Sequence, residues 1–279
     1  MYKFNVLSTS EQEEVFTVQT AAMSIRGREK PSNEDLAFHR TKQMPSGHSI
    51  ALMVVCDGLG GYQVGSFASE LAAHIITTEI GKIFPHMDYR NARLEQPTIP
   101  GTEKLQAWLI KTVQEANHLI YQYASEQPEI RKSGTRLTLA LIQWKTAYIA
   151  HVGDTRAYLW RNFELTQITN DHTYVAELQR NGVLGADDVL HHPLRKIISR
   201  SVGTQPMVKP EIYTLSLWPG DKLMICSDGL WSTFEDPQTM ADILENNLPP
   251  SDLCSILIGE ARNRNDQDDI SVALASLNL

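Results

Sequence analysis

Two similar segments far apart in the chain each end an apolar run in Asp-Gly, ALMVVCDG at 51–58 and KLMICSDG at 222–229. A continuous run of Leu, Met, Val and Ile predicts a strand that is buried on both faces. Each segment therefore delivers a carboxylate, Asp57 or Asp228, where a strand leaves the core. Neighbouring carboxylates repel and raise each other's pKa unless a cation lies between them. A divalent metal ion is therefore their natural partner.

Acidic residues recur at the ends of other expected elements. Asp35 closes a charged loop, Asp154 follows an apolar run, and Asp268 stands just before the last apolar run. With Asp57 and Asp228 they make five aspartates, and each alone is of a type common at caps and turns. Together they suit an oxygen-rich site for Mg²⁺ or Mn²⁺, which prefer carboxylates, carbonyls and water to soft ligands.

Length and composition favour one domain spanning residues 1–279. The chain has 42% hydrophobic residues, enough for a large core, and no linker or repeat divides it. Residues 85–101 are expected to form a polar surface loop. The net charge of -8 argues against a nucleic-acid binder, although a phosphorylated substrate stays compatible with it.

The protein is expected to be a cytoplasmic monomer without a membrane span. No stretch reaches 18 uncharged apolar residues, and residues 1–7 are too short for a signal-peptide core. Three cysteines without a C-x-x-C pair suit a reducing compartment. No heptad pattern or apolar stripe calls for a dimer.

Apolar periodicity predicts strands and helices that are grouped in blocks. Strands are expected at 15–25, 51–58, 136–144, 147–152, 156–160, 212–217, 222–225 and 270–277, and helices at 65–84, 104–123, 171–181, 187–190, 237–246 and 252–263. The three runs between 136 and 160 suggest an antiparallel meander. Blocks of strands with grouped helices favour antiparallel sheets covered by helices, an α+β fold.

Six short motifs carry a family resemblance. They are Asn33-Glu-Asp35, Asp57-Gly-Leu-Gly-Gly61, Ser133-Gly-Thr135, Gly153-Asp-Thr-Arg156, Ser227-Asp-Gly229 and Asp268-Asp-Ile-Ser271. In this order they resemble the signatures of the PP2C-type (PPM family) metal-dependent Ser/Thr protein phosphatases, from about Thr17 to Ser276. The resemblance to a compact bacterial-style catalytic domain implies an α-β-β-α sandwich. In that fold, two antiparallel sheets pack between helical layers, and metals lie in a cleft at one edge.

The resemblance also implies a set of metal ligands. Asp57 would bridge two ions, and the Gly58 carbonyl would bind one of them. Asp228 and Asp268 would complete the first ion's shell, while Asp35, and Glu34 more weakly, would support the second. A third, weaker ion would be shared by Asp154 and Asp228.

The implied reaction is hydrolysis of phosphoserine and phosphothreonine in proteins, with Mg²⁺ or Mn²⁺ as cofactors. Two ions roughly 3.5–4 Å apart activate a bridging water and stabilise charge on the phosphoryl group, so no protein nucleophile is needed. The implied partners are phosphorylated proteins, including a Ser/Thr kinase that the phosphatase opposes.

Two departures from the family pattern concern the substrate phosphate and the proton. Lys30 stands where the family has an arginine that holds phosphate; it keeps the charge without the bidentate fork, and Arg28 could substitute for it. Leu59 and Tyr62 stand where many relatives carry a histidine implicated as the general acid, so that role is unassigned.

Two further departures lie beside the metal ligands. Asp269 replaces a usual asparagine and either adds negative charge near the ions or faces away. Ser232 occupies a position that is acidic in some relatives, which makes the third ion less certain than the first two.

Residues 155–203 would form the family's flap, a variable region beside the cleft. His191 and His192 are adjacent on a short element and are not expected to bind one ion together. His172 is expected to order the loop, and His151 to be structural. Arg156 is expected to be a buried partner for a carboxylate.

Two alternatives to an active protein phosphatase stay open. Lys30 and the missing histidine suggest a catalytically weak or inactive phosphoprotein-binding protein, against which the retained Asp57, Asp228 and Asp268 argue. The other alternative is a metal-dependent phosphoesterase of a small metabolite, which nothing in the sequence excludes. Activity on a phosphothreonine peptide and on nucleotides would separate the two enzymes, and a metal titration would separate both from the binder.

Overall fold

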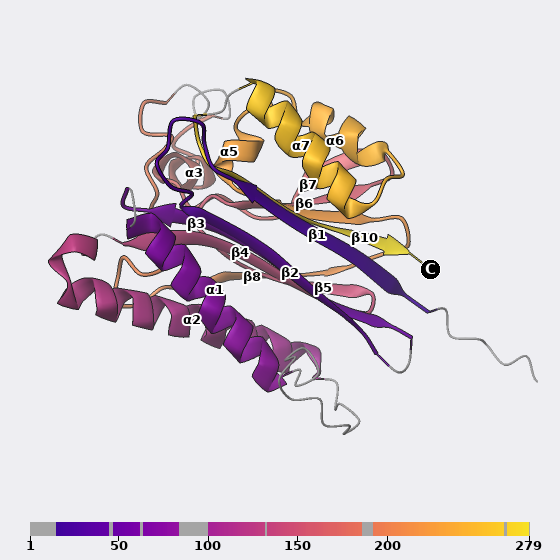
Figure 1. The fold of residues 1–279 in the computed structure, drawn as a ribbon, viewed down its shortest axis with the longest axis horizontal. Coiled ribbons are helices and arrows are strands. Elements are labelled where there is room, and N and C mark those ends of the chain that lie inside the picture. The colour runs from indigo at the N-terminus through magenta and orange to yellow at the C-terminus, as the bar shows by residue number, and fades with distance from the viewer. Residues whose placement is uncertain are drawn as a thin grey trace, which may run out of the picture.

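The computed structural model describes residues 15–44, 47–61, 64–83, 100–131, 133–185, 192–264 and 267–278. These residues form two antiparallel sheets of five strands each, packed face to face, with helices on both outer faces (Figure 1). The predicted α+β class and α-β-β-α sandwich are therefore confirmed.

Each sheet combines strands from both halves of the chain. The first sheet has the order β1 (Thr17–Ile25), β10 (Ile270–Asn278), β9 (Lys222–Cys226), β6 (Arg156–Arg161) and β7 (Glu164–Gln167). The second sheet has the order β2 (Asp35–Gln43), β3 (Ser49–Leu59), β4 (Gly134–Gln143), β5 (Thr146–Val152) and β8 (Glu211–Ser216).

The helices form the two outer layers (Figure 1). The second sheet is covered by α1 (Val64–Ile83) and α2 (Thr102–Glu126), and the first sheet by α5 (Asp228–Trp231), α6 (Pro237–Glu245) and α7 (Pro250–Arg264). The short helices α3 (Tyr174–Arg180) and η2 (Pro128–Ile130) lie in connections.

Alternation along the strands fills three separate apolar layers. On β3, Leu52 and Val54 pack toward α1 and α2, whereas Met53 and Val55 enter the core between the sheets. Successive strand side chains point to opposite faces, so a strand that is apolar at every position is buried on both. The prediction that the first Asp-Gly strand is buried on both faces is confirmed.

The predicted meander over 136–160 is wrong in its last strand. β4 and β5 pair as expected, but β6 crosses to the first sheet and pairs with β9 and β7. The free edge of β5 is taken by β8. On β6, Ala157 and Leu159 fill the core between the sheets, while Tyr158 and Trp160 pack toward the α6 and α7 layer. In the first sheet, β6 therefore has both of its faces buried.

The segment 155–203 begins as part of the first sheet, because it contains β6 and β7. The chain leaves the sheet after Gln167 and returns to the second sheet through a bridge between Val202 and Thr135. The predicted helix at 171–181 is α3, which begins after the N-cap Thr173. The predicted helix at 187–190 and most of the predicted loop at 85–101 lie outside the described residues.

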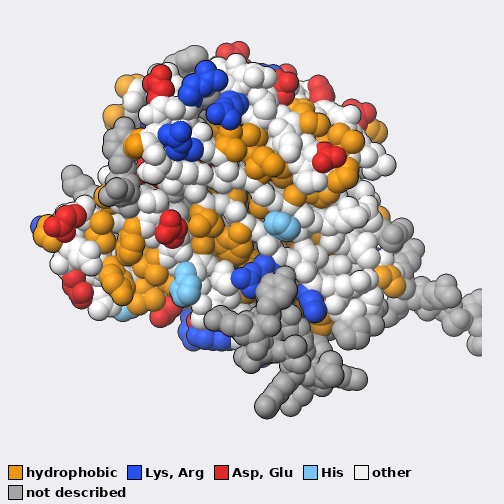
Figure 2. Space-filling model, viewed as in Figure 1, with side chains coloured by type: hydrophobic (Ala, Val, Ile, Leu, Met, Phe, Trp, Pro, Cys, Tyr) orange, Lys and Arg blue, Asp and Glu red, His pale blue; other side chains and the backbone are white. Residues whose placement is uncertain are grey.

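The surface shows no continuous basic stripe on the face drawn in Figure 2, where basic side chains form small separate groups among acidic and apolar ones. Such a stripe is the usual footprint of nucleic-acid binding. Among the described residues, none of the helices has the length and apolar character needed to cross a bilayer.

Candidate metal centre and active site

Three charged side chains form a row across the second sheet. Asp35 opens β2 and is the register partner of Asp57 on β3, which in turn is the register partner of Arg136 on β4. Register partners project to the same face of a sheet. Since their neighbours Cys56 and Leu137 pack toward α1 and α2, the charged row faces the space between the two sheets.

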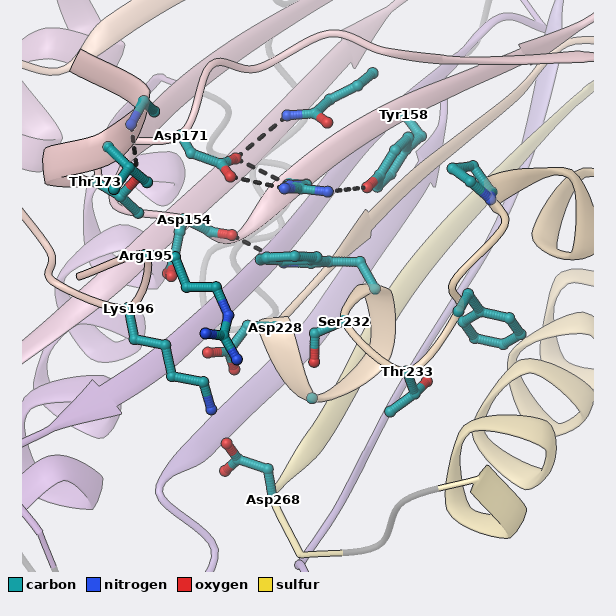
Figure 3. Close-up of a pocket in the computed structure, with 18 of the residues that line it drawn as sticks. Asp154, Tyr158, Asp171, Thr173, Arg195, Lys196, Asp228, Ser232, Thr233 and Asp268 are labelled. Carbon is teal, nitrogen blue, oxygen red and sulfur yellow. Dashed lines mark hydrogen bonds and ion pairs between the residues drawn. The ribbon is translucent and has the colours of Figure 1, made fainter. Parts of the chain in front are cut away.

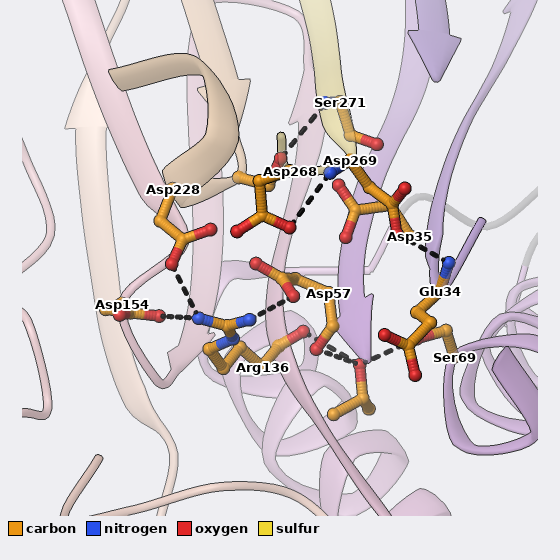
Figure 4. A network of polar contacts seen from close by, with 12 residues as sticks. Glu34, Asp35, Asp57, Ser69, Arg136, Asp154, Asp228, Asp268, Asp269 and Ser271 are labelled. Atoms are coloured by element: carbon orange, nitrogen blue, oxygen red, sulfur yellow. Dashed lines mark hydrogen bonds and ion pairs between the residues drawn. The ribbon is translucent and has the colours of Figure 1, made fainter. Parts of the chain in front are cut away.

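The other predicted carboxylates come to this end of the sandwich from different elements (Figure 4). Asp228 begins α5 directly after β9, Asp268 precedes β10, and Asp154 lies in the turn from β5 to β6. The Ser227 hydroxyl accepts a hydrogen bond from the backbone N–H of Ser271 at 3.0 Å, which ties the end of β9 to the start of β10. The structure thus brings all five predicted aspartates to one end of the fold.

Arg136 lies among Asp57, Asp154 and Asp228 (Figure 4). Its Nη1 donates to Asp228 Oδ2 at 2.9 Å and to Asp154 Oδ1 at 3.3 Å, and its Nη2 donates to Asp57 Oδ1. Sequence reasoning missed this residue. The available signal was a lone charge in an otherwise apolar run, directly after the motif at 133–135.

The electrostatics of the cluster are those of buried carboxylates around one cation. Burial raises the pKa of Asp57 well above its usual value, opposed by the Arg136 charge. Burial likewise raises the pKa of Asp35 to about 7 and that of Asp154 to about 6. Burial by itself raises the pKa of Asp228, but the Arg136 charge, hydrogen bonds from Asp57 and Arg136 and the Lys196 charge together outweigh it and hold the pKa below its usual range. One arginine therefore leaves part of the negative charge uncompensated.

Three carboxylate oxygens have no hydrogen-bond partner although they are buried: Asp57 Oδ2, Asp35 Oδ2 and Glu34 Oε1. Buried polar atoms are nearly always paired, so orphaned carboxylate oxygens indicate a missing ligand such as an ion. Oxygen donors of this kind fit Mg²⁺ or Mn²⁺. Within the described residues, no three His, Cys, Asp or Glu side chains are already grouped closely enough to enclose an ion.

The Gly58 position is closed to any larger residue. A Cβ there would lie 2.6 Å from the backbone of Gly65 and 2.7 Å from the Glu34 carbonyl oxygen. The end of β3, the start of α1 and the Glu34 segment can pack this closely only around glycine. The backbone carbonyl of Asp57 accepts a hydrogen bond from Thr135 Oγ1 at 3.0 Å, which fixes the chain here.

Lys30 and Asp269 tie the N-terminal charged loop to the centre. Lys30 Nζ lies 2.5 Å from Asp268 Oδ1 and 3.1 Å from Asp269 Oδ2, so its charge already meets carboxylates. The buried Asp269 carboxylate also accepts the backbone N–H groups of Gly27 and Glu34, each at 2.8 Å. Asp269 therefore anchors this loop.

A cleft of about 730 Å³ opens beside the centre. Lys30 lines it, and so do Arg195 and Lys196 from the predicted flap, which extend toward Asp228 (Figure 3). Arg28 is exposed and is not among the described residues that line the cleft. Sequence reasoning did not single out Arg195 or Lys196, because local patterns do not show where a flap folds back.

One wall of the cleft is held by Arg156. Its guanidinium binds both carboxylate oxygens of Asp171, at 2.9 and 2.7 Å, and lies 3.4 Å from the centre of the Trp231 ring. The indole N–H of Trp231 donates to the Asp154 carbonyl at 2.9 Å. The expected pairing of Arg156 with a carboxylate is found.

The histidines are structural in this arrangement. His151 and His172 are fully buried, with ring centres 4.7 Å apart. The Gly153 N–H donates to His172 Nδ1 at 3.1 Å, so His172 orders the turn that carries Asp154, whereas the sequence predicted that it orders the flap loop. His192 Nδ1 accepts the backbone N–H of Leu194, while His191 lies outside the described residues.

Comparison with known proteins decides the family. The family model for protein phosphatase 2C matches residues 19–270. The chain belongs to the protein phosphatase 2C family. This confirms the resemblance stated from the six motifs, and with it the predicted protein phosphatase activity.

Members of the 2C family with known names or structures cover most of this chain. The serine/threonine phosphatase stp of Listeria innocua is 31% identical over 256 residues, which are 91% of this chain and 94% of that protein. The serine/threonine phosphatase structure from S. agalactiae superposes with a TM-score of 0.78 at 26% identity, over 93% of this chain and 99% of that one. A PstP catalytic domain solved with two manganese ions gives a TM-score of 0.75 at 26% identity, over 95% and 100% of the two chains.

Proposed function

We propose that this protein hydrolyses phosphoserine and phosphothreonine in proteins, with Mg²⁺ or Mn²⁺ as cofactors. The observation that carries the proposal is the set of orphaned carboxylate oxygens on Asp57, Asp35 and Glu34, at the end of the sandwich where Asp228 and Asp268 also lie. When bound, two divalent ions supply an activated water and offset the charge that develops on the phosphoryl group.

The chain's own residues would divide the binding of the ions between the two sheets. Asp57 would contact both ions, and the second sheet would add Asp35, Glu34 and the Gly58 carbonyl. From the first sheet, Asp228 and Asp268 would complete the site. No protein side chain is needed as a nucleophile in this scheme.

Substrate phosphate would be held by the cations of the cleft. Of the two residues proposed from the sequence, Lys30 lines the cleft and Arg28 is not among the described residues that line it, and the cleft adds Arg195 and Lys196. Since Lys30 Nζ contacts Asp268 and Asp269, a phosphate would have to share its three donors with these carboxylates. Within the part of the chain that the structure describes, Arg195 and Lys196 form no ion pair with a carboxylate, although the Lys196 charge helps to lower the pKa of Asp228. They are therefore the stronger candidates for the first contact with an incoming phosphate.

The alternative of a weak or inactive phosphoprotein-binding protein is favoured by one observation. Arg136 already neutralises part of the charge of Asp57, Asp154 and Asp228. Its position would lower metal affinity if it competed with the catalytic ions.

Phosphate release separates these possibilities. The protein is assayed on a phosphothreonine peptide, on p-nitrophenyl phosphate and on a panel of nucleotides, each with Mn²⁺ and with chelator. The proposal expects metal-dependent cleavage of the peptide. Cleavage of nucleotides alone would replace it with a metabolite phosphoesterase, and Mn²⁺ binding without cleavage of any substrate would replace it with a binding protein.

We also propose a partner, a location and an oligomeric state for the protein. A Ser/Thr kinase that this enzyme opposes is the partner suggested by the chemistry. The three cysteines, Cys56, Cys226 and Cys254, are free and buried, which is compatible with a cytoplasmic location. We propose one domain, since residues from both sheets build the core between them, and a monomer as the default oligomeric state.

A further inference from the structure

Arg136 is a buried arginine in the middle of an acidic cluster. Its side chain is 12% exposed, and the rest of β4 is almost entirely buried. A buried charge is tolerated only where partners offset its loss of hydration. Its partners here are three carboxylates that come from β3, from the turn after β5 and from α5.

The guanidinium occupies the position between two of these carboxylates. Nη1 lies 2.9 Å from Asp228 Oδ2 and 3.3 Å from Asp154 Oδ1. These two side chains are the pair that a third metal ion would share. An ion such as Mg²⁺ needs oxygen ligands at about 2.0–2.1 Å, so an ion held by the same two oxygens would overlap with Nη1.

The packing around Arg136 holds it in this place. Gly153, with φ +113°, lies directly on the arginine stem: a Cβ there would be 2.6 Å from the Arg136 Cβ. The Trp231 indole fixes the carbonyl of Asp154, and the register with Asp57 fixes the backbone of Arg136. The stem and backbone of Arg136 are thus packed in place, and its guanidinium is held by the three carboxylates.

The contacts of Arg136 leave the rest of the cluster open. Asp57 Oδ1 accepts a hydrogen bond from the guanidinium, whereas Asp57 Oδ2 has no hydrogen-bond partner. Asp35 Oδ2 and Glu34 Oε1 have none either. The arginine thus lies on the Asp154 side of Asp57, and the orphaned oxygens lie on Asp57 itself, on Asp35 of the neighbouring strand and on Glu34.

We propose that Arg136 is a built-in cation at the Asp154–Asp228 position, so that the protein binds two divalent ions and no third. The inference rests on the proposed function, because it presumes ions on the remaining carboxylates. Arg136 acts through Asp228 and Asp57, and it is therefore a positioning residue. Asp154 becomes a partner of the arginine instead of a metal ligand.

Counting bound Mn²⁺ on the full chain tests this inference. Chelator-treated wild type, Arg136→Ala, Arg136→Lys and the double variant Arg136→Ala/Asp154→Asn are titrated by calorimetry, with free Mn²⁺ followed by electron paramagnetic resonance. We expect two ions on the wild type and on the lysine control, which keeps the cation. Arg136→Ala should gain a third, weaker ion that the double variant loses.

Several outcomes would overturn the inference. A third ion on the wild type, or only two on a folded Arg136→Ala variant, would each contradict it. Circular dichroism reports whether Arg136→Ala is folded. If Arg136→Ala does not fold, the single variant Asp154→Asn is titrated instead. Two bound ions, as in the wild type, would support the inference, and loss of an ion would overturn it. Fewer than two ions on the folded wild type would instead contradict the proposed function.

Discussion

At the scale of single residues, Asp269 shows why a departure from a family pattern can be a structural device. Its side chain is fully buried, and its polar contacts with described residues are all with donors: the backbone N–H groups of Gly27 and Glu34, and Lys30 Nζ. A carboxylate accepts at both oxygens, whereas an asparagine would turn one NH₂ group toward a donor. Asp269 therefore fixes the loop that carries Glu34 and Asp35.

The substitution Asp269→Asn should destabilise the protein, although it restores the residue usual in the family. We expect a loss of about 1–3 kcal/mol in the free energy of unfolding, because a buried donor loses its acceptor. Urea denaturation measures it, with the exposed Glu245→Gln as the matched control. A loss no larger than that of the control would mean that the loop is anchored by other contacts.

Lys196 should act on substrate binding, because it is an exposed cation that extends toward Asp228 in the cleft. Lys196→Met is expected to raise KM for a phosphothreonine peptide roughly two- to fivefold, the range of exposed ion pairs, with little change in kcat. Lys209→Met, at an exposed lysine that is not among the residues lining the cleft, is the control. Equal effects of the two variants would argue against a local phosphate contact.

At the scale of elements, the crossing from β5 to β6 depends on a buried histidine pair. His172 donates its backbone N–H to the Gly153 carbonyl at 2.7 Å and accepts the Gly153 N–H at Nδ1. The proton therefore sits on Nε2, 3.1 Å from Glu211 Oε1 on β8. His151 stacks against this ring from β5, bound to Thr138 Oγ1 and to the Asn170 carbonyl.

Acid should lower the free energy of unfolding because the rings of His151 and His172 are buried in their neutral form. Burial, assisted by the nearby His172, lowers the pKa of His151 to about 3 from 6.5. Burial, with Arg200 and Arg180 nearby, lowers that of His172, although Glu211 opposes the shift. Between pH 6.5 and about 3, His151 binds a proton in the unfolded chain and stays neutral in the folded chain. The stability that depends on the neutral ring is therefore fully present above pH 6.5 and is lost as the pH falls.

The slope of this loss should be about 1.4 kcal/mol per pH unit for each histidine that stays neutral. Unfolding free energies from pH 7 to pH 4.5 are compared for wild type, His151→Asn and the exposed-site control His118→Asn. Carboxylates titrate in all three proteins, so the comparison isolates the ring. We expect a shallower slope for His151→Asn only; identical slopes in all three would contradict a neutral buried His151.

At the scale of the whole molecule, the core between the sheets holds together the two halves of the metal centre. Asp35 and Asp57 belong to the second sheet, and Asp228 and Asp268 to the first. Side chains such as Met53 and Ile225 meet in the layer between them. If packing in this core layer were weakened, the aspartates of the second sheet would move away from those of the first sheet, although all of them are proposed to bind the same ions.

Ile225→Ala should therefore destabilise the entire fold. Ile225 is fully buried on β9, and its truncation should cost about 2–5 kcal/mol in the free energy of unfolding. Ile256→Ala, at a position 39% exposed on α7, should stay within about 0.5 kcal/mol of the wild type. Fluorescence and circular dichroism transitions that coincide would support one domain, and two separated transitions would contradict it.

The sequence predicted the ends of strands better than the partners of strands. Asp57 and Asp228 could be placed because each closes an apolar run. The strand β2 (Asp35–Gln43) was not predicted, because it lies at a sheet edge and carries many partly exposed polar residues. The contact of Arg136 with Asp228, 92 residues away, depends on how the two sheets meet, which no local pattern records.

We expect the carboxylates at the end of the sandwich to bind ions that activate water for the hydrolysis of a phosphoprotein. The most direct test is the rate of phosphate release from a phosphothreonine peptide across a Mn²⁺ titration, for wild type, Asp57→Asn and the exposed-site control Asp252→Asn. The rate of phosphate release by wild type and control should show saturable Mn²⁺ dependence. The rate for Asp57→Asn should be lower by roughly 100-fold or more. Cleavage without metal, or a folded Asp57→Asn variant as active as the wild type, would contradict a metal-dependent reaction at these carboxylates.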